Sequence, residues 1–381
     1  MEQKTKPIVH IITGLEDAGA EGALYRLCTN DPTTRHIVIS LSGMGKYGPM
    51  LEAKGIPVHA MRLTPGSLGK GLMTLRGMLR DHDPQAVQTW MYEADVFGGI
   101  AARLAGISNV FWSIRFSQVD MKGVPAKMAL AIRLSKPLSR LVPKGIISCA
   151  HVAKDEHIRL GYTANPDKWH VVHNGYDFAT LVRDPALGAG LRQELGIPAS
   201  LPLIGMVARY DPQKDHESLL QALGGIDRPF GLLLVGRGVD TDPEVTALLA
   251  QHNLTDKTWR LGSTPRVRDV FNALDIHVLA SRFGEGFPNV VAEAMACGAA
   301  SISTDSGDAR YILEDRGFLT PMRQPWALRR AITAQLDLNT HRPDVDQWRD
   351  ANRRHVTDRF DIQTMIAQFH AIWNKAGQAA T

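Results

Sequence analysis

The sequence predicts an α/β fold in which two Rossmann-like lobes face each other across a cleft. Short β-branched runs alternate with helical patterns along the 381 residues, which is typical of parallel sheets covered by helices. The alternation forms two successive series of similar length, separated by a segment rich in turn residues. The length suggests two or three domains, and 44% hydrophobic residues suffice for a core in each. Sheets of this kind bind ligands at the carboxyl ends of their strands.

The expected strands are short β-branched and aromatic runs bounded by turn residues. The first series holds seven of them, at 8–13, 36–41, 57–62, 86–90, 110–115, 145–149 and 169–173. The second series holds five, at 203–208, 230–235, 258–261, 276–279 and 300–303. The turn-rich segment between the series contains one short helix, near 186–195. Near the C-terminus, Ile362, Met365, Ile366 and Phe369 recur at helical spacing and predict an amphipathic helix.

Composition excludes several classes of protein. The 43 Lys and Arg against 39 Asp and Glu leave a formal charge of +4, too small an excess to indicate nucleic-acid binding. Three scattered cysteines, Cys28, Cys149 and Cys297, disfavour a disulfide framework and a zinc site. The start of the chain lacks the pattern of a signal peptide, and no apolar stretch approaches the ~18 residues of a spanning helix. We therefore expect a cytoplasmic protein, soluble or peripheral to a membrane.

The segment 275–298 is the most informative part of the sequence. A strand gives way to a loop with two glycines, and Pro288 is placed as the first residue of the following helix. Such a loop lets a ligand approach the backbone, and the helix N-terminus offers N–H groups to an anion. Glu293 is the only charged residue of that apolar helix, and Glu285 lies eight residues earlier. Glu293 therefore either pairs with a protein donor or accepts hydrogen bonds from ligand hydroxyls.

The loop after the expected strand 203–208 carries two cations. Arg209 stands at the carboxyl end of the strand, and Lys214 follows a turn, just before a helix capped by Asp215. Both side chains can reach one diphosphate, and positive groups placed where negative charge develops assist its departure. The alternative is an ordinary solvated arginine and lysine.

The stretch GEGFPNVVAEAMACG (284–298) resembles the E-x7-E segment of retaining glycosyltransferases with the GT-B fold, specifically glycosyltransferase family 4 (group 1 type). Other segments occur in the family's order, so the resemblance covers nearly the whole chain. It implies that Glu293 binds the ribose hydroxyls of a nucleotide-sugar donor and that Glu285 contacts the donor sugar. It also implies that Arg209 and Lys214 bind the phosphates, with no metal or other cofactor required. The further donor-binding residues it implies are Gly236, Gly286, Phe287, Pro288 and Asn289.

Two glycine loops match the family in part. The N-terminal strand, glycine loop and helix fail the GxGxxG dinucleotide pattern, which disfavours a dehydrogenase. Gly19 and Ala20 match the family's glycine loop, whereas Ala18 departs from it, so we expect Gly19 and Ala20 to contact the acceptor or a phosphate. Gly236 belongs to a segment resembling the family's second glycine turn, with a plain tight turn as the alternative.

Two further segments complete the comparison with the family. The HNGYD stretch (173–177) resembles the family's hinge between lobes, which is a structural feature. Glu93 stands in a region where many members carry a histidine near the reacting sugar. Glu93 either hydrogen-bonds a sugar hydroxyl in its place or caps a helix that begins near Ala94.

These observations imply an organisation and a function. We expect an acceptor lobe over 1–180, a linker over 181–201, a donor lobe over 202–360, and a C-terminal helix over 361–381 packing back on the first lobe. The implied activity is retaining sugar transfer to an acceptor hydroxyl in the biosynthesis of surface polysaccharide, lipopolysaccharide or glycolipid. The resemblance implies front-face attack, in which the departing phosphate helps to take the acceptor proton. The alternatives are a nucleotide-sugar epimerase or hydrolase, and a catalytically silent nucleotide-sugar-binding protein.

A basic stripe in 125–144 suggests a surface for the acceptor. Arg133, Lys136, Arg140 and Lys144 follow helical spacing on one face, and Pro137 is expected to kink or split the helix. One interpretation is a helix that packs its leucines on the sheet and exposes a solvated basic face. The other adds that the stripe rests on anionic lipid, as a lipid-linked acceptor at the inner membrane face would require.

Overall fold

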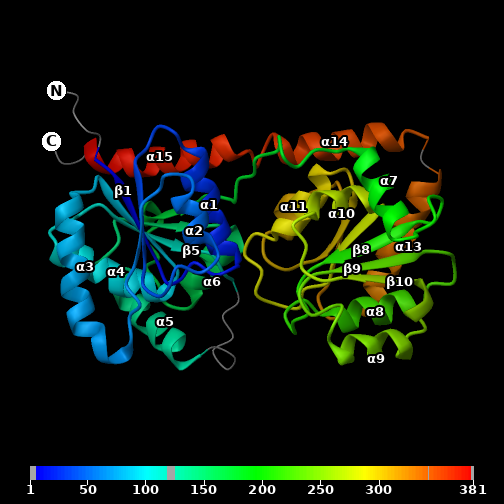
Figure 1. Cartoon of the computed structure of the whole chain (residues 1–381), viewed down its shortest axis with the longest axis horizontal. Coiled ribbons are helices and arrows are strands. Elements are labelled where there is room, and N and C mark those ends of the chain that lie inside the picture. The colour runs from blue at the N-terminus through cyan, green and yellow to red at the C-terminus, as the bar shows by residue number, and fades with distance from the viewer. Residues whose placement is uncertain (1–5, 118–124, 342, 379–381) are drawn as a thin grey trace. The chain divides into compact units, whose positions relative to one another are not determined.

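The computed structural model describes residues 6–117, 125–341 and 343–378. It divides the chain into two compact units, one running to Tyr176 and resuming at Ile362, the other running from Asp177 to Asp361. The boundary between Tyr176 and Asp177 lies inside the HNGYD stretch. Each unit is a sheet with helices on both faces (Figure 1).

The first unit contains a seven-stranded parallel sheet with the order β3-β2-β1-β4-β5-β6-β7. Its strands are β1 (Ile8–Ile12), β2 (His36–Ser40), β3 (Val58–Ala60), β4 (Ala86–Trp90), β5 (Val110–Ile114), β6 (Gly145–Ser148) and β7 (Trp169–Val171). Its helices are α1 (Gly19–Asn30), α2 (Tyr47–Glu52), α3 (Leu68–His82), α4 (Tyr92–Leu104), α5 (Ala126–Leu138), α6 (His151–Arg159) and α15 (Ile362–Gln378). Short 3-10 turns lie at η1 (Pro65–Ser67) and η2 (Pro166–Lys168).

The second unit contains a six-stranded parallel sheet with the order β10-β9-β8-β11-β12-β13. Its strands are β8 (Leu203–Val207), β9 (Gly231–Val235), β10 (Thr258–Leu261), β11 (Ile276–Leu279), β12 (Ala300–Thr304) and β13 (Phe318–Thr320). Its helices are α7 (Pro185–Glu194), α8 (His216–Gly224), α9 (Pro243–Gln251), α10 (Val267–Ala273), α11 (Asn289–Ala296), α12 (Ala309–Leu313), α13 (Pro325–His341) and α14 (Val345–Thr357), with a 3-10 turn η3 (Thr255–Lys257).

The predicted α/β class is confirmed, and every expected strand is present. The boundaries shift by one or two residues, as strand ends do. The sequence prediction omitted β13, a three-residue strand at the sheet edge that pairs only with β12. Three residues are too few for periodicity to reveal a strand. No helix among the described residues is long and apolar enough to cross a membrane.

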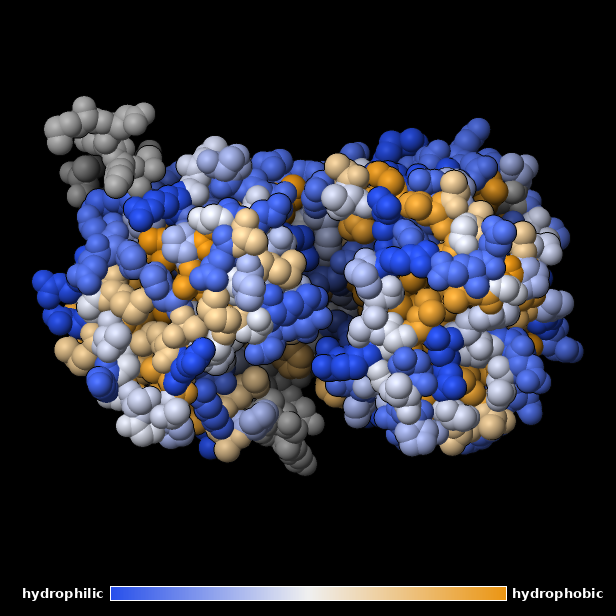
Figure 2. Space-filling view, viewed as in Figure 1, coloured by the Kyte–Doolittle hydropathy of each residue, from blue (hydrophilic) through white to orange (hydrophobic). Residues whose placement is uncertain are grey.

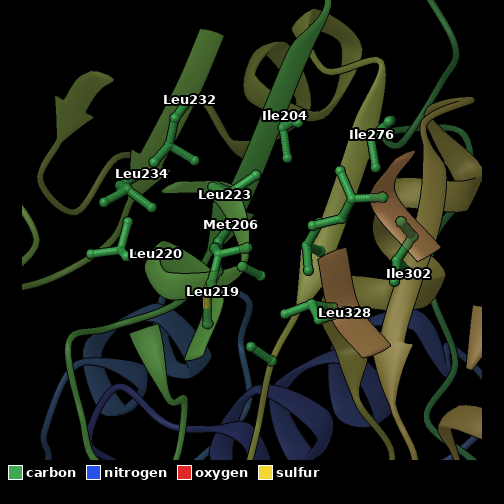
Figure 3. Packing of buried hydrophobic residues seen from close by; sticks show 14 of the residues in the cluster. Ile204, Met206, Leu219, Leu220, Leu223, Leu232, Leu234, Ile276, Ile302 and Leu328 are labelled. Atoms are coloured by element: carbon green, nitrogen blue, oxygen red, sulfur yellow. The ribbon is translucent and has the colours of Figure 1, made fainter. Parts of the chain in front are cut away.

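Buried apolar side chains fill both faces of the second sheet. On one face, residues of β8, β9, β11 and β12 pack against α8 and α13 (Figure 3). Ile204, Met206 and Leu219 are fully buried there. On the other face, the core is formed by residues of α7, α10 and α11. Because each fully buried aliphatic side chain contributes about 1.5–3 kcal/mol, this double-sided core holds the strand ends in fixed positions.

The C-terminal helix α15 belongs to the core of the first unit. Phe369 and Trp373 are buried against residues of β1, β2 and β4. His370 Nε2 lies 2.5 Å from Asp31 Oδ2, and His36 Nε2 lies 3.2 Å from the same oxygen. Burial alone raises the pKa of Asp31, but hydrogen bonds from His36, from Thr33 and Thr34 and from His370 outweigh it and hold that pKa well below its usual range.

The segment 181–201, expected to be a linker, is instead part of the second unit. Its helix α7 packs on α10. Arg192 of α7 donates to the Ala273 carbonyl at 2.9 Å and forms an ion pair with Asp275 at 2.7 Å. Turn-rich composition indicated a connection, but it carries no information about such tertiary contacts.

Candidate functional site

The candidate site of the second unit lies where its strand order reverses. β8 is flanked by β9 on one side and by β11 on the other, so the order of the strands along the sheet reverses at β8. Open parallel sheets bind ligands in the crevice at such a switch point, outside the carboxyl ends of the strands. The loops after β8, β9, β11 and β12 all begin at this edge, and those after β8, β9 and β11 carry predicted donor residues.

Arg209 and Lys214 lie on the loop after β8, as the sequence indicates. Asp211 shapes this loop because its Oδ1 accepts from the Gln213 backbone N–H at 2.8 Å and its carbonyl accepts from the Lys214 N–H at 2.9 Å. Arg209 Nε donates to Asp211 Oδ2 at 3.2 Å, and Arg209 Nη2 to Gln213 Oε1 at 3.3 Å. The Arg209 side chain remains 44% exposed, so it can meet an anion from solution.

Lys214 and Glu285 are brought into direct contact. Lys214 Nζ lies 2.5 Å from Glu285 Oε1, and the two side chains are only 14% and 10% exposed. Ser281, two residues after the end of β11, donates its hydroxyl to the same carboxylate oxygen at 2.6 Å. The fold therefore joins residues 71 positions apart, one from the loop after β8 and one from the loop after β11, into a single charged contact.

Arg282 ties the β8 and β11 loops together, which the sequence analysis did not foresee. Its backbone N–H donates to the Gln213 carbonyl at 2.9 Å, and its guanidinium forms an ion pair with Asp215. Asp215 also caps α8 as predicted, accepting from the Ser218 N–H at 3.3 Å, and it adopts a left-handed conformation with φ of 54°. These contacts hold the residues on either side of Lys214 in place.

At two glycines of the site, neighbouring backbone segments approach each other so closely that a side chain would not fit. At Gly307, which has a φ of 60°, a Cβ would lie 2.3 Å from the Gly286 carbonyl oxygen. The N–H of Asp308 donates to that carbonyl at 2.9 Å, which anchors the Glu285–Gly286 loop to the end of β12. At Gly236 a Cβ would lie 2.2 Å from the Ala208 carbonyl oxygen, and φ is 144°. Gly236 is thus required where the β9 turn meets the β8 loop.

Helix α11 carries the remaining donor candidates. It begins at Asn289, so Pro288 precedes the helix instead of being its first residue, as had been predicted. Phe287 is 5% exposed and packs its ring edge-on against Phe360, with centroids 5.0 Å apart, so this side chain belongs to the core. Glu293 is half-buried, while Ala292 and Ala294 beside it are fully buried.

Two buried histidines near Lys214 were not predicted. Burial, and then the charge of Lys214, lowers the pKa of His277 to about 3, and the same two causes lower that of His216 to about 4. Neither ring has a hydrogen-bond partner among the described residues. Both are therefore neutral at physiological pH. A histidine inside a strand or at a helix start gives no sequence signal of this kind.

The first unit has a corresponding switch point between β1 and β4. Gly19 begins α1, with Ala20 as its second residue, and both follow the loop that leaves β1. Glu93 lies in the first turn of α4, which begins at Tyr92, two residues before the expected start near Ala94, and its Oε2 accepts from Thr13 Oγ1 at 3.5 Å. Glu93 is thus half-buried beside the end of β1.

Met91, between β4 and Glu93, has a φ of 72° and a ψ of 162°. Such a backbone conformation costs about 1–3 kcal/mol in a residue other than glycine, and it persists where surrounding structure enforces it. Strain of this kind clusters at binding and catalytic sites. The sequence contains no signal for it, because methionine ordinarily adopts helical or extended conformations.

The predicted basic stripe is only partly correct. Arg133 and Lys136 lie on α5, which runs through Pro137 without splitting and ends at Leu138. Arg140 is in the following turn, and Lys144 lies next to β6 and donates to Asn109 Oδ1 at 3.3 Å. The leucines expected on the sheet are exposed: Leu130 by 56%, Leu134 by 44% and Leu141 by 77%.

Comparison with known proteins gives consistent similarities. Residues 201–337 match the family described as Glycosyl transferases group 1. The chain is 25% identical over 335 residues to a putative glycosyltransferase, EpsF, of Bacillus subtilis, covering 80% of this chain and 81% of that one. It is 26% identical over 265 residues to an Escherichia coli UDP-Gal:alpha-D-GlcNAc-diphosphoundecaprenol alpha-1,3-galactosyltransferase, covering 66% of each.

Solved structures match over nearly the full length. The Anabaena protein HepE, crystallised with UDP, aligns with a TM-score of 0.86 at 21% identity, covering 97% of this chain and 100% of that one. WaaG, a glycosyltransferase involved in lipopolysaccharide biosynthesis, aligns with a TM-score of 0.72 at 15% identity, covering 96% and 98%. At these identities the structural matches establish the fold.

Proposed function

We propose that this chain, a glycosyltransferase of the GT-B fold whose residues 201–337 belong to the Glycosyl transferases group 1 family, transfers a sugar from a nucleotide-sugar donor to an acceptor hydroxyl with retention. The observation that carries the proposal is the contact of Lys214 with Glu285 at the switch point of the second sheet. A lysine that can bind a phosphate lies there beside a carboxylate that can bind sugar hydroxyls. Binding of a sugar diphosphate requires both groups.

The chemistry follows from where these charges lie. Departure of a nucleoside diphosphate builds negative charge, which Lys214 and Arg209 stabilise from the β8 loop. The backbone N–H groups at the start of α11 add to this field. No divalent metal is needed in this scheme, because two cations occupy its electrostatic role.

Glu285 is assigned to sugar binding and not to nucleophilic attack. Its Oε1 already accepts from Lys214 and Ser281, and a carboxylate held by two such donors is a weak nucleophile. Retention then proceeds by attack of the acceptor on the face that the diphosphate leaves. The acceptor proton passes to the departing phosphate oxygen as the new glycosidic bond forms. Glu293 binds the ribose hydroxyls from α11.

We propose a lipid-linked glycan as the acceptor, used at the inner face of the membrane. Two relatives support this, because their names specify diphospho-undecaprenol acceptors: the Escherichia coli galactosyltransferase and a Campylobacter jejuni N-acetylgalactosaminyltransferase that is 27% identical over 164 residues. The product of such an enzyme enters surface polysaccharide, lipopolysaccharide or glycolipid. In the first unit, Gly19, Ala20 and Glu93 at the β1–β4 switch point are the candidates for acceptor contact.

Two measurements test the proposal. A thermal-shift panel of nucleoside diphosphates and nucleotide sugars identifies the donor, because a ligand of the folded state raises its stability by mass action. Transfer from that donor to undecaprenyl-linked glycans is then followed by mass spectrometry, and the anomeric configuration of the product by NMR. An inverted product refutes retention. Donor turnover without any acceptor identifies a hydrolase or epimerase instead, and binding without turnover identifies a silent binding protein.

A further inference from the structure

The outer face of α5 is apolar, although it is not covered by any described part of the first unit. Leu130 and Leu134 are exposed by 56% and 44%, and Leu141, in the turn after the helix, by 77%. Ala131, Ile132 and Ser135 on the opposite face are buried. The helix is therefore anchored through small and β-branched residues, and its large leucines point to solvent.

The exposed leucines form one continuous stripe. Leu130, Leu134, Pro137 and Leu141 are spaced by four, three and four residues, which places them on one side of a helix. The helical hydrogen-bonding pattern continues into the turn after α5, where the Val142 N–H donates to the Leu138 carbonyl at 2.8 Å. Leu141 therefore stays on the same side as Leu130 and Leu134. We call this set the α5 leucine stripe.

The apolar surface extends to the end of α4. Arg103 Nε donates to the Val142 carbonyl at 2.8 Å, which fixes that end beside the turn after α5. The next residue, Leu104, is 50% exposed. In Figure 2, orange and tan residues alternate with blue ones over the region where Figure 1 draws α5. Among these residues, Leu104, Leu130, Leu134 and Leu141 are exposed on neighbouring segments. Large exposed apolar side chains that lie together mark an interaction surface, whereas scattered single ones do not.

Charge complementarity indicates the partner. Between residues 125 and 150 the chain has five basic residues and no acidic one. Arg133 and Arg140 are exposed beside the stripe, and Lys127 is exposed in the first turn of α5. A polyanion would explain the arginines but not the leucines. An anionic bilayer explains both, because its headgroups attract the cations and its acyl boundary accepts the apolar side chains.

We propose that the α5 leucine stripe inserts below the headgroups of an anionic membrane, with Arg133 and Arg140 on the lipid phosphates. This proposal rests on the proposed use of a lipid-linked acceptor, since it brings the first unit to the membrane that holds that acceptor. It differs from a purely electrostatic contact because the leucines give the bound state a component that salt does not screen.

The test is co-sedimentation of the full chain with vesicles of phosphatidylcholine, with or without 30% phosphatidylglycerol, in salt from about 50 to about 500 mM, which shortens the Debye length from roughly 14 to roughly 4 Å. We expect binding only with phosphatidylglycerol, and a residual bound fraction at the highest salt. Leu130→Gln/Leu134→Gln/Leu141→Gln should bind at low salt and lose the residual fraction. Arg133→Gln/Arg140→Gln should bind several-fold less at low salt.

Matched controls are Leu338→Gln and Lys54→Gln, at exposed positions outside this surface, which should bind as the wild type does. The proposal is overturned if the wild type ignores phosphatidylglycerol vesicles at low salt, or if the leucine variant keeps its full salt-resistant fraction. Stabilisation by the donor nucleotide is measured on the same variants. If it persists while membrane binding is absent, the docking surface is refuted and the transferase function is not.

Discussion

Glu285 and Lys214 neutralise each other when no donor is bound. Because both side chains are largely buried, removing one leaves a poorly solvated charge on the other. Under the proposed function, a donor diphosphate has to draw Lys214 partly away from Glu285, which then becomes available to sugar hydroxyls. In that scheme the pair couples recognition of the diphosphate to recognition of the sugar. Conservative replacements separate this role from stability more cleanly than alanine does.

Glu285→Gln should reduce turnover more than donor binding. The amide keeps the shape and an oxygen that accepts from Ser281, but it no longer provides a charged acceptor for the sugar. Glu293→Ala should instead weaken nucleotide binding by about 1–3 kcal/mol, the range for hydrogen bonds to a charged group. Calorimetric titration with the donor nucleotide and steady-state transfer kinetics distinguish the two effects. If both variants transfer sugar at near wild-type rates, the assignment of these glutamates is wrong.

Lys214→Ala should cost about 2–4 kcal/mol of transition-state stabilisation, as loss of one placed electrostatic group does. The measurement is kcat/KM for transfer, in buffer with excess EDTA after exhaustive dialysis. Wild-type activity should survive this treatment. Lys257→Ala is a suitable control, because Lys257 precedes β10 and so lies at the amino edge of the same sheet. Loss of wild-type activity in EDTA, with recovery on adding magnesium or manganese, would contradict the two-cation scheme.

At the scale of elements, sequence patterns located the loops but not the contacts between them. The strand ends placed Arg209, Lys214 and Glu285 at one sheet edge, since parallel strands share a direction. The contact of Lys214 with Glu285 depends on the strand order β8-β11, which no local pattern encodes. Gly307 and Asp308 were overlooked although they follow an expected strand, because a short polar turn there looks like any other.

Arg282 is the clearest example of a contact between loops, and it yields a third prediction. Arg282→Gln removes an ion pair to Asp215, whose side chain is 1% exposed, and Asp215 also caps α8. We expect a loss of roughly 1–3 kcal/mol in the free energy of unfolding, together with a higher KM for the donor. Urea unfolding and donor-dependence of the rate measure the two effects.

The control for Arg282 is Arg310→Gln, whose ion pair with Asp305 has side chains 72% and 40% exposed. Exposed pairs of this kind contribute about 0–1 kcal/mol, so this variant should unfold almost as the wild type does. Equal stability of the two variants would show that the β8 and β11 loops are held together without Arg282.

At the scale of the whole molecule, alternation of strands and helices was enough to predict two parallel sheets. It was not enough for α5, where the sequence suggested that leucines face the sheet. The helix instead buries Ala131 and Ile132 and packs on α4. Amphipathic patterns identify a helix, but they do not say which of two apolar sides the fold covers.

Buried neutral histidines in both units predict a stability that depends on pH. Burial lowers the pKa of His157 in the first unit to about 4, and His216 and His277 in the second unit have pKa values of about 4 and 3. In the unfolded chain a histidine titrates near 6.5, so below that pH the unfolded state binds protons that the folded state does not. The contribution of these neutral histidines to the free energy of unfolding is therefore fully present above pH 6.5 and declines as the pH falls towards 4.

His277→Leu isolates one of these contributions. Its ring has no hydrogen-bond partner among the described residues, so an apolar replacement of similar volume should fold. A histidine that is protonated in the unfolded chain but not in the folded one changes the free energy of unfolding by about 1.4 kcal/mol per pH unit. Between pH 6.5 and pH 5 this amounts to roughly 2 kcal/mol. We expect urea unfolding of the variant to lose up to that much of the wild-type pH dependence. An identical pH dependence in His277→Leu and the wild type would mean that His277 is protonated inside the fold, which would place a positive charge near Lys214 and require a carboxylate to compensate it.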